Sequence, residues 1–250
     1  MPRPDKIFLS AEWRDLVMLN YEVGPAHLQK YVPPGTELDS FDGKTYASLV
    51  GFRFCRTKLL GTLPIPFHTE FEEINLRFYV RRREGNEIRR GGVFIAEIVP
   101  RRAIAYTARW FYGENYVRRP MSHRVLTNES KMEAEYSWRS GNEWCKLQAH
   151  ANGTPSLPAA GSLEQFITEH YWGYSHHSAG STVEYHVSHV PWKVWTATHA
   201  EFSGNASDLY GDELSQLLAK APASAFIADG SPVQVFRGYR LPSRTRYASS

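Results

Sequence analysis

The sequence predicts an α+β protein whose centre is an antiparallel β-barrel or sandwich. Stretches in which apolar and polar residues alternate recur along most of the chain, and a period of two is typical of strands with one buried face. Turn-forming pairs such as Asp42-Gly43 and Gly85-Asn86 lie between these stretches. Helical patterns are few, so the crossover helices that a parallel sheet needs are missing.

The expected strands follow one another along the chain. They are Leu16–Glu22, Thr45–Phe54, Glu70–Arg82, Val93–Val99, Ala103–Phe111, Lys131–Trp138, Glu143–His150, Thr182–Val190, Val194–Phe202, Ser224–Ala228 and Val233–Arg240. Two further turn signals, Ser140-Gly141-Asn142 and Asp229-Gly230, are expected to separate neighbouring strands.

Three segments have helical signals. Pro25–Tyr31 begins with a proline, which suits the first turn of a helix. Leu163–Tyr171 follows a capping box made by Ser162 and Gln165, and its apolar residues fall on one face. Leu209–Lys220 has apolar residues at helical spacing.

The composition favours a globular protein with a substantial core. Of the 250 residues, 42% are hydrophobic and 14% aromatic. We expect one domain over residues 1–241 and a polar tail over 242–250. The Gly/Pro/Ala-rich stretch 152–161 is interpreted as a loop, with a domain boundary as the alternative. The sequence has no apolar run long enough for a membrane span or a signal segment, so a cytoplasmic location is expected.

The net charge of +3 permits an anionic substrate and falls short of a nucleic-acid-binding surface. The arginines at 81–83 and 89–90 flank a hairpin turn, where Glu84 and Glu87 reduce the local positive charge. The two cysteines and the scattered histidines have no recognised metal spacing, so no metal and no cofactor are predicted. His170 is expected to be a hydrogen-bonded core histidine.

The most informative segment is Phe71–Val80. With a period of two, one face carries Ile74, Leu76, Phe78 and Val80, and the other carries Glu73, Asn75, Arg77 and Tyr79. The polar face either meets water or lines a polar pocket. Only in the second case does this strand predict a site.

Several blocks together resemble the YqjF-like domain of unknown function, a bacterial family, over about Phe8 to Leu241. They are Glu12–Leu16, Tyr31–Leu38, Tyr46–Phe54, Phe71–Val80 and His189–Trp192. That family is similar to the acetoacetate decarboxylase superfamily, and this resemblance implies an antiparallel barrel with a central ligand cavity.

The resemblance also implies residue roles. Phe71-Glu72-Glu73 is similar to an aromatic-x-Glu motif whose glutamate lines the pocket, so Glu73 takes that place. The decarboxylases carry a Gly-x-Pro-Lys segment whose lysine forms a Schiff base. The nearest match here is Gly113-Glu114-Asn115-Tyr116, with Tyr116 in the place of the lysine. Tyrosine forms no imine, so decarboxylation through an imine is not expected.

The candidate catalytic residues are Glu73 and Tyr116. Glu73 would move a proton, and Tyr116 would donate a proton or hold an oxyanion. The alternatives are an exposed Glu73 or one paired with Arg77, and a Tyr116 that only packs.

The candidate substrate-binding residues are Asn75, Arg77, Arg109 and Glu114. Either arginine would clamp a carboxylate. The alternative for Arg109 is a structural bridge to Glu97 or Glu114.

Three functions are compatible with these residues. The first is an enzyme acting on a small organic acid or an enolisable carbonyl compound. The second is a non-catalytic protein that binds a small metabolite. The third is a structural or interaction protein whose cavity is filled by its own aromatic side chains. The sequence leaves open whether the protein forms a homo-oligomer.

Overall fold

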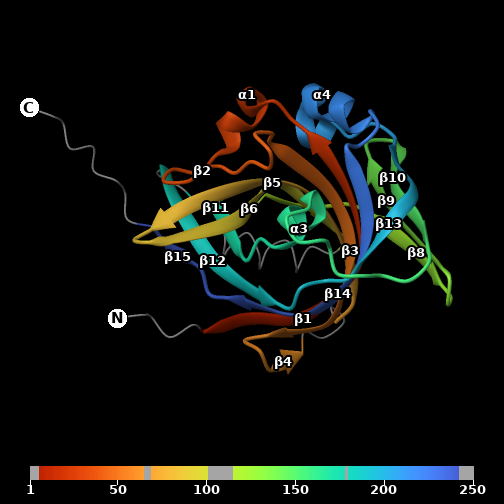
Figure 1. The fold of residues 1–250 in the computed structure, drawn as a ribbon, viewed down its shortest axis with the longest axis horizontal. Helices are drawn as coiled ribbons and strands as arrows, with labels where there is room; N and C mark the ends of the chain where they lie inside the picture. Colours follow the sequence, from red (N-terminus) through yellow and green to blue (C-terminus); the bar gives the residue numbers. More distant parts are fainter. Residues whose placement is uncertain (1–5, 65–68, 101–114, 178–179, 242–250) are drawn as a thin grey trace, which may run out of the picture.

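A computed structural model describes residues 6–64, 69–100, 115–177 and 180–241. The expected strand Ala103–Phe111 and the tail 242–250 lie outside the described residues. Figure 1 shows β-strands throughout, with a few short helices placed over them. The predicted α+β class is confirmed, and within it the barrel architecture.

The strands are longer than expected, because the alternating stretches continue past their first polar interruptions. They are β1 Ile7–Glu22, β2 Glu37–Leu38, β3 Tyr46–Leu59, β4 Leu63–Pro64, β5 Phe71–Glu84, β6 Glu87–Val99, β7 Tyr116–Arg118, β8 Met121–Thr127, β9 Lys131–Ser140, β10 Glu143–Asn152, β11 Trp172–His177, β12 Ser181–His189, β13 Val194–Ser203, β14 Ser224–Phe236 and β15 Tyr239–Arg240.

A ring of strands forms the barrel. In the described residues the ring consists of β1, β3, β5, β6, β11, β12 and β14. Residues 187–189 of β12 pair with residues 233–235 of β14 and close it. Neighbours in the ring are antiparallel except β6 and β11, which pair in parallel at Trp172↔Gly91 and Gly173↔Gly92. Beyond β14, the strands β13, β10, β9 and β8 continue as an outer sheet (Figure 1).

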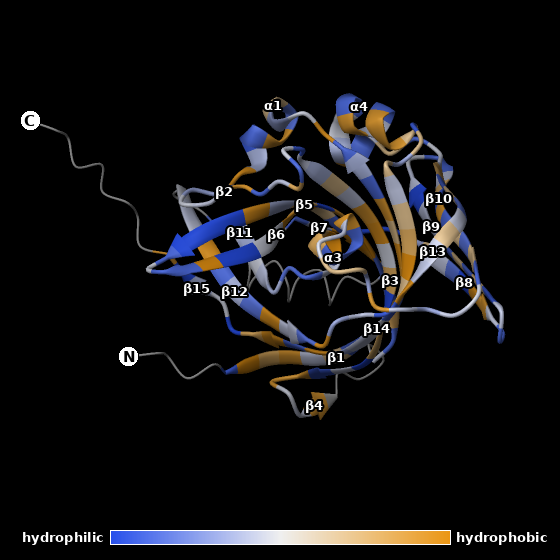
Figure 2. Cartoon of the chain, in the orientation of Figure 1, coloured by the Kyte–Doolittle hydropathy of each residue, from blue (hydrophilic) through white to orange (hydrophobic). Residues whose placement is uncertain are grey.

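The two faces of β5 have different surroundings. Ile74, Leu76, Phe78 and Val80 belong to the main core, together with Tyr136, Trp138 and Leu147 of the outer sheet. This packing is tight: a Cβ on Gly51 of β3 would lie 2.9 Å from both Ile74 and Tyr136. Figure 2 shows the resulting alternation of hydrophobic and hydrophilic residues along the strands. The opposite face of β5 is therefore turned into the barrel.

The predicted turn at Asp229-Gly230 is wrong, because β14 runs through it without a break. Gly230 has φ +76°, and a Cβ there would lie 1.9 Å from the Trp13 carbonyl oxygen. Asp15 on the neighbouring strand also has a positive φ, of 57°. The glycine thus allows β14 to stay against an irregular stretch of β1. By contrast, Gly43, Gly85 and Gly141 occupy tight turns with positive φ, as predicted.

The helices are shorter than or shifted from the predictions. α1 covers Pro25–Leu28 and continues as the 3₁₀ turn η1 at Gln29–Tyr31. α3 covers Leu163–Thr168; Ser162 Oγ accepts from the Gln165 amide at 3.2 Å, and the helix ends before His170. α4 covers Ser207–Leu218 and is kinked at Gly211, whose φ is +77°. Among the described residues no helix has the length and apolarity needed to cross a membrane.

A buried carboxylate joins strands at one end of the barrel. Glu184 of β12 is fully buried. Arg89 Nη1 donates to Glu184 Oε1 at 2.6 Å, and Arg82 Nη1 donates to Oε2 at 3.1 Å. Tyr239 of β15 also donates to this carboxylate. The network therefore ties the β5–β6 hairpin to β12 across the intervening strand β11.

Candidate functional site

The barrel contains a partly open cavity of about 160 Å³. The polar face of β5 lines it with Glu73, Asn75, Arg77 and Tyr79. Glu97 of β6 and Tyr116 of β7 line it as well, and these two residues are neighbours in a parallel strand pair. Four of the predicted site residues, Glu73, Asn75, Arg77 and Tyr116, are thus brought to one cavity.

Glu73 is the centre of the polar wall. It is 3% exposed, and Asn75 is 2% exposed. The Asn75 amide nitrogen donates to Glu73 Oε1 at 3.0 Å, and the Tyr116 hydroxyl donates to Oε2 at 3.4 Å. Because Asn75 turns its donor to the carboxylate, its oxygen is directed elsewhere as an acceptor. The Glu73 carboxyl group therefore contacts both an amide and a phenol.

Arg77 supplies a positive charge to the same cavity. Its guanidinium lies 5.8 Å from the centre of the Tyr79 ring. Within the described residues it has no carboxylate within 4.0 Å, so the proposed pairing with Glu73 is not formed. Its buried Nε also has no hydrogen-bond partner there. A half-buried cation without a carboxylate partner in the described residues is well suited to receive an anionic ligand.

Unsatisfied buried polar atoms gather around this cavity. Among the described residues, those that line it are Trp13 Nε1, Thr57 Oγ1, Asn75 Oδ1, Arg77 Nε and His170 Nδ1. Leaving such a group without a partner costs about 1–3 kcal/mol. Native proteins keep few such groups, so their concentration in one cavity indicates a place where a polar ligand or water is bound.

His170 and Asp39 form a part of the site that the sequence did not reveal. His170 lies after α3 and not within it, and Nε2 is 3.4 Å from Asp39 Oδ2. Arg90 Nε donates to the same Asp39 oxygen at 2.6 Å. The predicted core histidine is therefore buried, but it lines the cavity. No spacing connects residues 39, 90 and 170 in the sequence, since three separate segments supply them.

Burial controls the charge of these groups. It lowers the pKa of His170 to about 4, because the nearby Asp39 compensates only in part. Burial alone would raise the pKa of Asp39, but the hydrogen bonds with His170 and Arg90 outweigh it, and the pKa falls to about 2. Burial also lowers the pKa of His189, another lining residue, to about 4. At neutral pH the cavity thus has two uncharged imidazoles.

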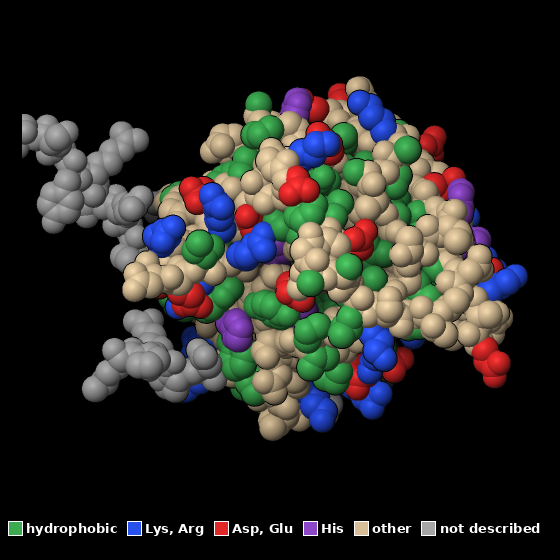
Figure 3. All heavy atoms as spheres, in the orientation of Figure 1, with side chains coloured by type: hydrophobic (Ala, Val, Ile, Leu, Met, Phe, Trp, Pro, Cys, Tyr) green, Lys and Arg blue, Asp and Glu red, His purple; other side chains and the backbone are tan. Residues whose placement is uncertain are grey.

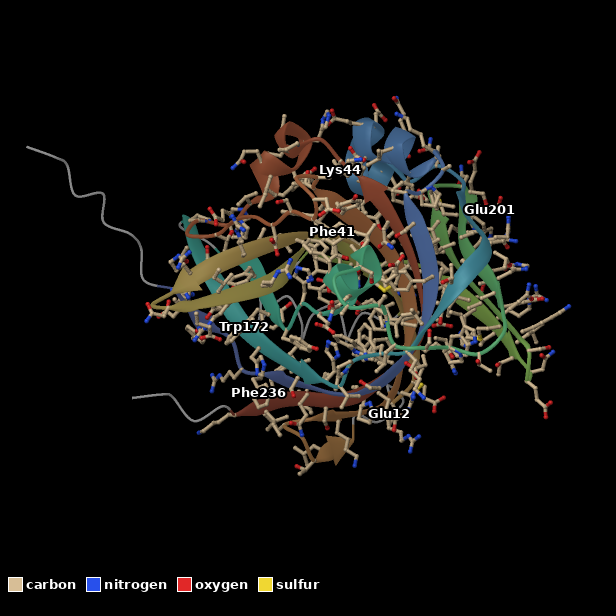
Figure 4. The ribbon with its side chains drawn as sticks, in the orientation of Figure 1. Glu12, Phe41, Lys44, Trp172, Glu201 and Phe236 are labelled. Atoms are coloured by element: carbon tan, nitrogen blue, oxygen red, sulfur yellow. The ribbon has the colours of Figure 1, made fainter. Side chains whose placement is uncertain are left out.

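Aromatic rings form much of the remaining wall. Trp13 of β1 lies 5.4 Å from Phe52 and 5.9 Å from Phe54, and Trp192 lies 6.1 Å from Trp13 (ring centres). His189 stacks on Trp192 at 4.3 Å. On another side is Trp172, the first residue of β11, which is labelled in Figure 4. The cavity therefore combines a polar wall with an aromatic one.

No lysine lines the cavity, although all eight lysines belong to the described residues. Lys44, labelled in Figure 4, lies instead on the surface and binds Glu22 at 2.8 Å. On the face in Figure 3, Lys and Arg are interspersed with Asp and Glu. No three His, Cys, Asp or Glu side chains converge as metal ligands in the described part of the chain.

Two predicted site residues, Arg109 and Glu114, lie outside the described residues, and so does the alternative bridge between Arg109 and Glu97. The roles of Glu73, Tyr116, Asn75 and Arg77 stay predictions. The structure shows only where their side chains lie.

The stability of the fold is expected to depend on His170 below neutral pH. The folded pKa of about 4 lies below the unfolded value of 6.5. The unfolded chain therefore binds more protons as the pH falls from 6.5 to 4, and stability is lost over that window. At pH 5 this one group costs about 2 kcal/mol relative to pH 7.

Urea unfolding of His170→Phe at pH 7 and pH 5 measures this dependence. The variant is expected to lose about 2 kcal/mol less than the wild type between the two pH values. Exposed His199→Phe is the control and should keep the wild-type difference. An unchanged difference in His170→Phe would contradict the prediction.

Comparisons with known proteins agree with this architecture. A relative in Bacillus subtilis (strain 168), the uncharacterized protein YqjF, is 26% identical over 220 residues, which are 85% of this chain and 86% of that protein. The acetoacetate decarboxylase of Legionella pneumophila has a similar fold, with a TM-score of 0.64 at 15% identity, covering 98% of this chain and 93% of that one.

A second similar structure is the enduracididine biosynthesis enzyme MppR complexed with pyruvate. Its TM-score is 0.65 at 16% identity, covering 98% of this chain and 93% of that one. The resemblance to YqjF and to the decarboxylase-like fold is therefore confirmed. Residues 10–232 match the profile of the DUF2071 family, described as an uncharacterized conserved protein, and the chain belongs to that family.

Proposed function

We propose that the protein is an enzyme acting on a small organic acid or an enolisable carbonyl compound, without a Schiff-base lysine. One observation carries the proposal. A buried carboxylate, a phenol, an amide and an arginine without a carboxylate partner among the described residues share one cavity. Such a combination of convergent polar groups in a largely apolar pocket is typical of sites that bind and activate small molecules.

Each group has a distinct role in the proposed reaction. Arg77 holds the carboxylate of the substrate through charge-assisted hydrogen bonds. Glu73 moves a proton at the carbon next to the carbonyl group, and Tyr116 donates a hydrogen bond to the oxygen that gains negative charge. The contact between Glu73 and Tyr116 allows both groups to reach the same part of the substrate.

The missing lysine separates this proposal from imine chemistry. An imine needs an amine at the reacting carbon, and the eight lysines all lie away from the cavity lining. Enolisation requires only a base and a stabilised oxyanion, both of which the polar wall offers. One protein of similar fold binds pyruvate, a small oxo acid, which supports the substrate class.

The second candidate is a protein that binds a small metabolite without converting it. The absence of a lysine from the cavity favours it, because the decarboxylases depend on that residue. The third candidate, a cavity filled by its own aromatic side chains, is disfavoured by the volume of about 160 Å³. A single domain, a cytoplasmic location and self-association stay predictions.

Binding of acetoacetate measured by calorimetry tests the proposed site. Arg77→Met is expected to weaken binding at least about tenfold, because the charge-assisted bonds to the carboxylate are lost. Arg81→Met is the matched control, since Arg81 bonds Glu37 at 2.8 Å outside the cavity. Equal affinity in both variants would remove Arg77 from the site. Borohydride treatment with acetoacetate should label no lysine, and a labelled lysine would overturn the imine-free proposal.

A further inference from the structure

We propose that the substrate carries, in addition to its carboxylate, an apolar group about the size of a phenyl ring. This inference rests on the proposed function and specifies its substrate class: aryl or branched-alkyl oxo acids in place of two- to four-carbon acids. It follows from the distribution of polar and apolar side chains around the cavity.

The charged side chains are concentrated on one part of the wall, while Thr168 and His170 add polar groups at the end of α3. β5 contributes Glu73, Asn75 and Arg77, and β6 and β7 contribute Glu97 and Tyr116. These strands are neighbours in the sheet. The carboxylate and the reacting carbonyl of a substrate therefore have their partners on a single side.

The strands across the cavity from β5 are β1, β12 and β14, and these strands, like β3 next to β5, present mostly apolar side chains. Those that line it are Leu9, Trp13 and Leu16 of β1, Val50, Phe52, Phe54 and Leu59 of β3, Tyr185 and Val187 of β12, and Val235 of β14. On these strands Thr57, His189, the hydroxyl of Tyr185 and the indole nitrogen of Trp13 are the polar exceptions among the described lining residues. A ligand bound to the polar wall thus turns its other end toward hydrocarbon and aromatic edges.

The size of the cavity agrees with one ring. An apolar cavity of about 150 Å³ in another protein binds benzene, and the cavity here has about 160 Å³ and is not closed, so it holds a ring while the rest of the acid extends toward the opening. Acetoacetate would satisfy the polar wall and leave the apolar wall in contact with water, which is unfavourable. A phenyl group in place of its methyl group removes that contact.

Two acids that differ only in this group provide the test. Binding of benzoylacetate and acetoacetate is measured by calorimetry at millimolar concentrations. Benzoylacetate is expected to bind at least about tenfold more tightly, because burial of the extra ring carbons favours its complex by more than that factor even when the ring is only partly buried. Val187→Thr keeps the shape of the wall but adds a hydroxyl, and should reduce this preference several-fold with little effect on acetoacetate. Val190→Thr, at an exposed position next to β12, is the matched control.

The outcomes separate the inference from the proposed function. Acetoacetate binding with equal or weaker binding of benzoylacetate would overturn the apolar group and leave the proposed function standing. A preference that Val187→Thr leaves unchanged would also overturn it, because the ring would not lie on this wall. Failure of both acids to bind would count against the proposed function, and the inference with it.

Discussion

Glu73→Gln is expected to reduce turnover at least about 100-fold, while ligand binding changes little. General acid–base catalysis by one positioned group contributes about 10²- to 10⁴-fold. Glutamine keeps the shape and the hydrogen bond with Asn75, but it cannot accept and return a proton. The loss should therefore fall on kcat and spare KM. The measurement is steady-state kinetics with the oxo acid that calorimetry shows to bind most tightly.

Glu72→Gln is the matched control for this prediction. Glu72 is the preceding residue on the same strand, and its side chain bonds His123 of β8 at 2.6 Å and does not line the cavity. Its substitution should leave turnover unchanged. Equal turnover in Glu73→Gln and the wild type would remove the proposed proton carrier. If the wild type itself shows no turnover, the binding protein is favoured over the enzyme.

The largest effect on stability is expected for Glu184→Ala, a loss of about 3 kcal/mol in the free energy of unfolding. Removing one member of a buried ion pair costs about 3–5 kcal/mol when the partner stays buried. Arg82 and Arg89 are 14% and 18% exposed, so water can reach them in part and the lower end of that range applies. The measurement is urea unfolding at pH 7.

Glu37→Ala provides the comparison. Glu37 bonds Arg81 across neighbouring strands at 2.8 Å, but it is 68% exposed. An exposed pair contributes less than about 1 kcal/mol, so this variant should be near the wild type. Similar losses in the two variants would contradict the structural role assigned to the buried carboxylate.

The fold could be predicted from the sequence where one strand face is buried. β3 and β5 alternate because their apolar face packs against the outer sheet, and this makes the period of two visible. β8 and β11 escaped prediction for different reasons. β8 is a largely exposed edge strand without an apolar face. β11 contains Gly173, where a side chain would collide with Tyr185, and glycine normally weakens a strand signal.

The candidate site was predictable only where a single strand carries it. Glu73, Asn75 and Arg77 share one face of β5, so alternation indicated all three, and the aromatic-x-Glu resemblance indicated Glu73 as well. The Asp39–His170 pair and the indole of Trp13 come from segments far apart in the sequence. Only the closure of the barrel brings them to the cavity, and no local pattern records that closure.

A parallel pair such as β6–β11 is a consequence of the odd number of strands in the ring. Antiparallel neighbours reverse direction at every step around a closed ring, so an all-antiparallel ring requires an even number of members. The ring has seven strands in the described residues, so at least one pair of neighbouring strands has to be parallel. The parallel pair is β6–β11, which is joined through only two residue pairs. Gly92, Trp172 and Gly173 of this pair also line the cavity. In the described residues, the join with the fewest paired residues thus lies in the wall that a ligand would touch.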